Sequence, residues 1–123
     1  MPAKIVVCGA AGRMGKTLVT LITQTDGAQL AGAVEAAGNP TLGKDAGEIA
    51  GVGPRGVKIT ADFAALATAD AVALDFTNAT AALEHLRTAV QRHSPIVIGS
   101  TGFTPPQQAE LDTLAPQTRS VIA

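Results

Sequence analysis

The chain has 123 residues, of which 46% are hydrophobic and 15% are charged. This composition excludes a disordered chain, and the length suits a single domain with its own core. The net charge of −1 and the aromatic content of 2% argue against nucleic-acid binding, which needs a basic face or stacking side chains. The sequence shows neither a membrane-spanning apolar run nor a secretory leader. We therefore expect a cytoplasmic protein without membrane contact.

The first half of the chain predicts strands and helices in alternation. Residues 4–8 form a short apolar run, which is typical of a strand buried on both faces. Residues 13–25 carry apolar side chains at helical spacing, and residues 29–35 predict a second strand. Residues 36–56 are rich in glycine and predict an irregular segment with one helical turn near residues 45–49.

The second half continues this alternation. The predicted elements are a strand over residues 57–60, a short helix over 62–67, a strand over 71–76, a helix from a cap at Thr77 or Asn78 to about Arg92, a strand over 95–100, a helix over 105–114 and a strand over 120–123. This order predicts an α/β fold with a doubly wound parallel sheet of about six strands in one domain, residues 1–123. Because the last strand has nothing after it, we expect one domain of a larger protein.

Three glycines, Gly9, Gly12 and Gly15, stand where the first strand passes into the first helix. In the dinucleotide fingerprint, the first glycine permits a tight turn, the second lets a pyrophosphate approach the backbone, and the third lets the helix pack closely. Amide groups at the helix start then point at the anion. The spacing here, G-x-x-G-x-x-G, is a variant of the commoner G-x-G-x-x-G. We expect a Rossmann-type fold that binds a dinucleotide; the alternative is a turn that only packs the helix.

Further candidate groups follow the predicted strands at the same edge of the sheet. Glu35 ends the second strand, twenty residues after Gly15, where the fingerprint has an acid for the adenosine ribose. A solvated strand end is the alternative for Glu35. The segments DFT (75–77) and GSTGF (99–103) follow the fourth and fifth strands, where ligands bind in such folds, although ordinary loop and cap chemistry would also explain them.

The remaining candidate groups predict no catalytic or metal site. Cys8 lies in an apolar run, so we expect a small core residue whose thiol pKa is raised by burial. His85 and His93 lack further ligands at metal spacing, and we interpret both as surface residues. The residues therefore point to a cofactor site without a catalytic group.

Five segments together resemble a known family, dihydrodipicolinate reductase, also called 4-hydroxy-tetrahydrodipicolinate reductase. They are VVCGAAGRMG (6–15), AVE (33–35), LGKDAGEIAG (42–51), LDFTNATA (74–81) and IVIGSTGF (96–103). The resemblance implies an enzyme of lysine and diaminopimelate biosynthesis that uses NADH or NADPH to reduce its cyclic substrate to tetrahydrodipicolinate. The alternatives are another nicotinamide oxidoreductase, such as a semialdehyde or homoserine dehydrogenase, and a non-catalytic nucleotide-binding module.

The resemblance also implies roles for individual residues. The implied cofactor-binding residues are Gly9, Ala10, Ala11, Gly12, Arg13 and Met14 at the pyrophosphate, with Gly15 closing the motif, Glu35 at the ribose, Phe76 beside the cofactor, Gly99, Ser100 and Thr101 at the nicotinamide, and Ala123 where the next nicotinamide-contacting segment begins.

Two departures from the family pattern bear on the choice of cofactor. Ala36 and Asn78 stand where many members have a basic residue, and one of those basic residues pairs with the 2′-phosphate of NADPH. We therefore expect NADH to bind at least as well as NADPH, although Arg13 or Lys44 could compensate.

The length of the chain is a further departure. Family members are about twice as long, form homotetramers and carry their substrate residues in a second domain. We expect cofactor binding without turnover from this chain alone, because hydride transfer needs the acceptor held beside the donor.

Overall fold

The computed structural model describes residues 2–122, which form a parallel sheet flanked by helices. The elements, in chain order, are β1 (Ala3–Cys8), α1 (Arg13–Gln24), β2 (Ala28–Val34), α2 (Ala46–Ala50), β3 (Ile59–Thr60), the 3₁₀ turn η1 (Phe63–Ala65), β4 (Ala71–Asp75), α3 (Ala79–Arg92), β5 (Ile96–Ile98), α4 (Pro105–Leu114), the 3₁₀ turn η2 (Ala115–Gln117) and β6 (Ser120–Ile122). The predicted alternation of strands and helices is confirmed.

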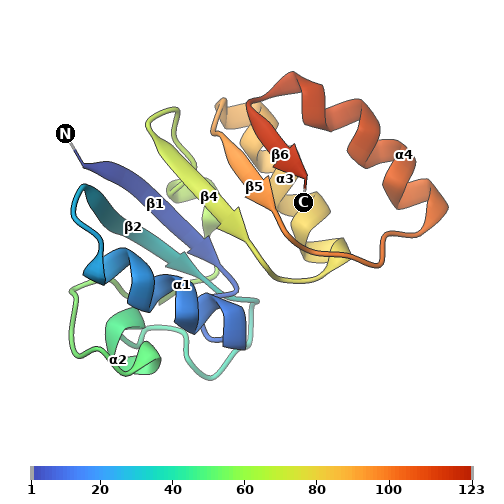
Figure 1. The fold of residues 1–123 in the computed structure, drawn as a ribbon. Helices are drawn as coiled ribbons and strands as arrows, with labels where there is room; N and C mark the ends of the chain where they lie inside the picture. The colour runs from blue at the N-terminus through green and yellow to red at the C-terminus, as the bar shows by residue number, and fades with distance from the viewer. Residues whose placement is uncertain (1, 123) are drawn as a thin grey trace.

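The six strands lie in the order β3-β2-β1-β4-β5-β6, and every neighbouring pair is parallel. The chain starts at the centre of the sheet, moves outward to β3, and then returns past β1 to build the other half from β4 to β6 (Figure 1). The order therefore reverses between β1 and β4, which is where ligands bind in doubly wound sheets. The predicted Rossmann-type fold is confirmed.

Helices cover both faces of the central strands. Val7 of β1 packs in one core cluster with Val19 and Ile22 of α1, whereas Val6 and Cys8 pack in the other, with the buried face of α3. Figure 1 accordingly shows α1 in front of β1 and β2, and α3 behind the sheet. Because successive strand residues point to opposite faces, the apolar run in β1 serves both clusters. Within residues 2–122, the helices are too short or too polar to cross a bilayer.

β3 is shorter than the predicted strand over residues 57–60, because Asp45 holds the chain that leads into it. The Asp45 carboxylate accepts hydrogen bonds from the amides of Gly47 and Glu48 at the start of α2, and from those of Arg55 and Gly56. The segment before β3 therefore bonds to the α2 loop, and only Ile59 and Thr60 pair with β2.

Other boundaries also differ from the sequence prediction. The short helix expected over residues 62–67 is the 3₁₀ turn η1, capped by the Asp62 carboxylate. β5 spans three residues, and the Gly99 amide makes the last hydrogen bond to β4, at the Asp75 carbonyl. Asn78, not Thr77, caps α3, and its side chain accepts from the Ala81 amide at 2.9 Å.

Candidate functional site

The turn between β1 and α1 is built around its glycines. Gly9 has a φ of +88°, which side-chain-bearing residues rarely adopt, and its amide donates to the Val34 carbonyl at 2.9 Å. A Cβ at Gly15 would lie 1.9 Å from the Gly9 carbonyl oxygen. The first turn of α1 is therefore pressed against the backbone of the loop, which matches the backbone roles expected for Gly9 and Gly15.

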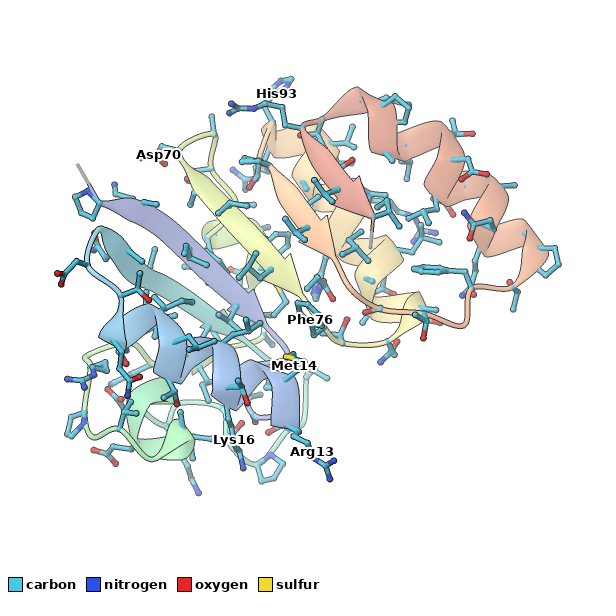
Figure 2. All side chains as sticks on the ribbon, in the orientation of Figure 1. Arg13, Met14, Lys16, Asp70, Phe76 and His93 are labelled. Atoms are coloured by element: carbon cyan, nitrogen blue, oxygen red, sulfur yellow. The ribbon has the colours of Figure 1, made fainter. Side chains whose placement is uncertain are left out.

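The N-terminus of α1 leaves its first amides open. Gly12 is the N-cap and supplies no side-chain hydrogen bond, and the first turn contains no acidic residue. The opening amides of a helix lack an intrahelical acceptor and lie at the positive end of its dipole. Arg13 and Met14 are exposed at this end (Figure 2). This end of α1 is therefore suited to an anionic group.

Glu35 follows β2 directly and ties the end of that strand to the glycine turn. Its Oε2 accepts from the Ala11 amide at 2.9 Å, and its Oε1 accepts from the Ala36 amide at 3.3 Å and from Nδ2 of Asn39 at 3.4 Å. A carboxylate offers about four acceptor positions, so one position is left for a sugar hydroxyl beside these three bonds. Glu35 is thus both a brace for the turn and a candidate ribose ligand.

Asp75, the last residue of β4, is fully buried and organises the loop that follows. Its Oδ1 accepts from the Thr77 amide at 3.1 Å and from the Thr77 hydroxyl at 2.6 Å. Its Oδ2 lies 2.5 Å from Nδ1 of His85, on α3. Burial of a carboxylate is tolerated only when hydrogen bonds replace its hydration. Asp75 therefore joins the end of β4 to the first half of α3.

The ring of Phe76 occupies the space that a side chain at residue 99 would need. A Cβ at Gly99 would lie 2.1 Å from Cε1 of Phe76, and the Gly99 amide donates to the Asp75 carbonyl at 2.9 Å. Figure 2 shows Phe76 and Met14 at the same edge of the sheet. The ends of β4 and β5 are therefore packed together through an aromatic ring on a glycine.

These groups surround a pocket of about 470 Å³ at the point where the strand order reverses. Its lining consists of Gly9, Gly12, Glu35, Ala36, Ala37, Ala61, Phe76, Thr77, Asn78, Ala81, Glu84 and His85. A larger and more open hollow of about 620 Å³ lies over β5 and β6 and shares none of these residues. We take the first pocket as the candidate site, because its position is the ligand position of open α/β sheets.

The segment after β5 lines a separate pocket of about 300 Å³, together with Leu111 of α4. Ser100 there is 8% exposed, and its Oγ is the one buried side-chain polar atom without a hydrogen-bond partner among residues 2–122. An unpaired buried hydroxyl costs about 1–3 kcal/mol, so a ligand that bonds to it would be favoured. Ser100 and Thr101 do not line the first pocket; of the neighbouring residues, Phe76 lines it, and the Phe76 ring packs on Gly99.

The remaining expected site residues lie in the turn or at its edge. Ala10 is buried in the turn, while Ala11 donates to Glu35. Arg13, Met14 and Gly15 open α1. Ala123 lies outside the described residues, so its expected place near the nicotinamide stays a prediction.

The prediction that His85 is a surface residue is wrong. Its side chain is 17% exposed, its Nδ1 is bonded to Asp75, and its ring packs edge-on against Phe63 with centroids 4.9 Å apart. Ala81 and His85 lie three and seven positions after the cap at Asn78, so the three residues share one helix face. This spacing could have revealed that His85 is not a surface residue. His93 is exposed at the C-cap of α3, as expected.

Other lining residues were also missed by sequence reasoning. Ala37, Ala61 and Glu84 belong to no motif, and Ala81, although it ends the segment LDFTNATA, was given no role; these residues reach the pocket because their loops and α3 meet there.

Cys8 is a core residue, as expected. Burial raises the pKa of its thiol well above the usual value, and the nearby carboxylates of Asp75 and Glu35 add to this effect. The sulfur of Cys8 and ligand atoms of Asp75 and His85 lie within 4.8 Å of one another. Because the thiol stays protonated and both Asp75 oxygens are engaged, we interpret this group as a hydrogen-bonded Asp–His pair beside a core thiol and not as a cation site.

The model of the family described as "Dihydrodipicolinate reductase, N-terminus" matches residues 3–123. A 4-hydroxy-tetrahydrodipicolinate reductase from Syntrophotalea carbinolica is 48% identical over 120 residues, a match that covers 98% of this chain and 45% of the relative. The enzyme of the same name from Anaeromyxobacter dehalogenans is 46% identical over 121 residues, covering 98% of this chain and 44% of the relative. The chain thus spans a little under half the length of these curated relatives.

A solved structure shows the same fold. The dipicolinate-bound dihydrodipicolinate reductase from Paenisporosarcina sp. TG-14 superposes with a TM-score of 0.71 at 21% identity, covering 100% of this chain and 47% of that one. At this identity the likeness concerns the fold alone. Because the family match extends over nearly all residues, this chain belongs to the dihydrodipicolinate reductase family and corresponds to its N-terminal part.

Proposed function

We propose that this chain is the nicotinamide-dinucleotide-binding domain of a 4-hydroxy-tetrahydrodipicolinate reductase. The observation that carries the proposal is the junction of Glu35 with the glycine turn, where Oε2 accepts from the Ala11 amide at 2.9 Å beside the pocket. A carboxylate held next to an anion-binding turn suits the ribose and pyrophosphate of a dinucleotide. Family membership supports reduction of 4-hydroxy-tetrahydrodipicolinate as the activity of the complete protein.

The residues present fit such a cofactor. Side chains at Gly9 and Gly15 would meet backbone atoms of the loops, and the first amides of α1 are uncapped. In the proposed arrangement the turn from Gly9 to Gly15 holds the pyrophosphate and Glu35 accepts from a ribose hydroxyl. Phe76, Gly99, Ser100 and Thr101 then form the nicotinamide end, where the unpaired Ser100 hydroxyl can bond to a carboxamide.

When bound, the reduced nicotinamide supplies a hydride, which this chain's residues would bind and orient. We assign no catalytic residue among residues 2–122. The chain covers 45% of the Syntrophotalea relative, and we propose that the hydride acceptor is held by the remaining part of the complete protein, which would also build the homotetramer.

The cytoplasm remains the expected compartment, since one cysteine forms no internal disulfide.

We further propose that the site prefers NADH, or at least does not favour NADPH. The carboxylates of Glu35 and Glu84 line the pocket, and neutral Ala36 and Asn78 stand beside them. Neither lysine nor arginine is among its described lining residues. A 2′-phosphate next to Glu35 would therefore meet like charge without a charge-assisted partner.

Fluorescence titration of the purified chain with NADH and NADPH tests this proposal. We expect NADH to bind at least as tightly as NADPH, and Glu35→Gln to weaken NADH binding about tenfold because the ribose loses a charged acceptor. Glu48→Gln is the matched control, because Glu48 is exposed on α2 and does not line the pocket.

Tenfold tighter binding of NADPH would contradict the preference, and failure of both dinucleotides to bind would contradict the proposed function. Coenzyme A serves as a further probe, since a non-catalytic nucleotide-binding module would bind it. Glu35→Ala should weaken binding of NADH and leave any binding of coenzyme A unweakened.

A further inference from the structure

His85, which lines the pocket, is paired with the buried Asp75, and the glycine fingerprint does not explain this pair. We propose that Asp75 is a positioning residue that fixes the tautomer of His85, so that His85 accepts a hydrogen bond from the cofactor base and selects a 6-amino purine over a 6-oxo purine. This inference rests on the proposed function, because it concerns the base end of the same dinucleotide site.

The first step concerns the proton on Nδ1 of His85. Oδ2 of Asp75 lies 2.5 Å from Nδ1, while Oδ1 accepts from the amide and the hydroxyl of Thr77. A carboxylate is an acceptor only, so Nδ1 must carry the hydrogen between them. In a neutral imidazole the other nitrogen, Nε2, is then an acceptor.

The second step concerns access to Nε2. Asp75 is 0% exposed, so a ligand cannot reach the carboxylate, whereas His85 lines the pocket. Nε2 makes no hydrogen bond to a described residue, and Ser100 Oγ is the one buried unpartnered side-chain atom in the described range. Nε2 is therefore reached by solvent and is free to accept from a ligand.

The third step places the base. With the ribose at Glu35, the pocket continues from the small side chains of Ala36, Ala37 and Ala61 toward α3. Glu84 and His85 of α3 line this end, and both offer acceptors. Adenine presents an exocyclic amine at C6, which donates to such acceptors. Hypoxanthine presents an oxygen at C6, which would leave them facing another acceptor.

The alternative is a pair that only holds α3 on β4. Asp75→Asn separates the two readings, because the asparagine oxygen can still accept from Thr77 while its amide donates to Nδ1 of His85. Nε2 then carries the hydrogen and becomes a donor. A purely structural pair would lower stability in this variant without changing the choice of base.

The test is fluorescence titration of the chain at pH 8 with NADH and with reduced nicotinamide hypoxanthine dinucleotide. We expect NADH to bind about tenfold more tightly, as for the gain or loss of one hydrogen bond. The ratio of the NADH affinity to the hypoxanthine-dinucleotide affinity should fall to about one or below in Asp75→Asn. It should fall to about one in His85→Phe, which keeps a ring against Phe63. His93→Asn, at the exposed C-cap of α3, is the matched control and should keep the ratio.

A ratio of one in the wild-type chain, or an unchanged ratio in a folded Asp75→Asn or His85→Phe variant, would overturn the inference while leaving the proposed function in place. If neither dinucleotide binds, the result contradicts both this inference and the proposed function. Nitrogen-15 NMR of the wild-type imidazole gives a reading that needs no variant. We expect Nδ1 protonated and Nε2 unprotonated at pH 8, and a protonated Nε2 would also overturn the inference.

Discussion

At the scale of single residues, the absence of a side chain at Gly15 decides how α1 meets the turn. Replacing glycine with alanine inside a helix normally stabilises the helix by up to about 1 kcal/mol. Here the added Cβ would lie 1.9 Å from the Gly9 carbonyl oxygen and 2.8 Å from Cα of Ala10. Both neighbours are backbone atoms and cannot rotate away.

We therefore expect Gly15→Ala to destabilise the chain by about 1–3 kcal/mol, the usual cost of overpacking, and to weaken NADH binding. Urea unfolding and fluorescence titration measure the two effects. Thr17→Ala is the matched control, because Thr17 is exposed on α1 and its replacement should leave both properties nearly unchanged. Wild-type stability in Gly15→Ala would show that α1 can move away from the turn.

At the scale of elements, the loop around α2 depends on one carboxylate. Asp45 accepts from four backbone amides, and these bonds, with that of Arg55 the largest contributor, lower the pKa of Asp45 from its usual 3.8. Because the folded-state pKa is depressed, the ionised carboxylate stabilises the fold above the unfolded-state pKa. This contribution is lost as the pH falls through the folded-state value.

We expect Asp45→Asn to lower the Tm by a few degrees at pH 7, since an amide accepts fewer of these hydrogen bonds. The difference from the wild type should shrink as the pH falls below about 4. Thermal unfolding across this pH range is the measurement. Asp26→Asn is the control, because Asp26 is exposed and should leave the Tm unchanged at either pH. A pH-independent difference would show that Asp45 acts through packing.

At the scale of the whole molecule, the doubly wound sheet brings the ends of β1, β2 and β4 to one edge, where they line the candidate site. Catalysis also requires the hydride acceptor to be held at contact distance from the hydride donor. Since the chain covers 45% of the Syntrophotalea relative, we expect it to bind NADH without oxidising it when 4-hydroxy-tetrahydrodipicolinate is added.

Absorbance of NADH in the presence of that substrate measures turnover. The full-length Syntrophotalea relative is the positive control, and it should oxidise NADH under the same conditions. Steady NADH oxidation by the purified 123-residue chain would contradict this expectation and would place an acceptor site within it.

Much of the fold and part of the site could be predicted from local patterns. β1 is a continuous apolar run, α4 begins with Thr104 followed by Pro105, and the glycines stand between a strand and a helix. Such signals act over a few residues, so their elements appear where expected. Element ends were less predictable: β3 has two residues because Asp45 holds the preceding segment from across a loop.

The sequence by itself determined the order of the elements, the glycine turn and the acid that follows β2, because propensity, periodicity and spacing along the chain carry that information. Only the tertiary structure decided what lies across the pocket from them. His85 meets Asp75 ten positions away in the sequence, and Phe76 covers Gly99, because the phase of α3 and the pairing of β4 with β5 set those distances. These contacts depend on packing between elements, which local sequence patterns do not encode.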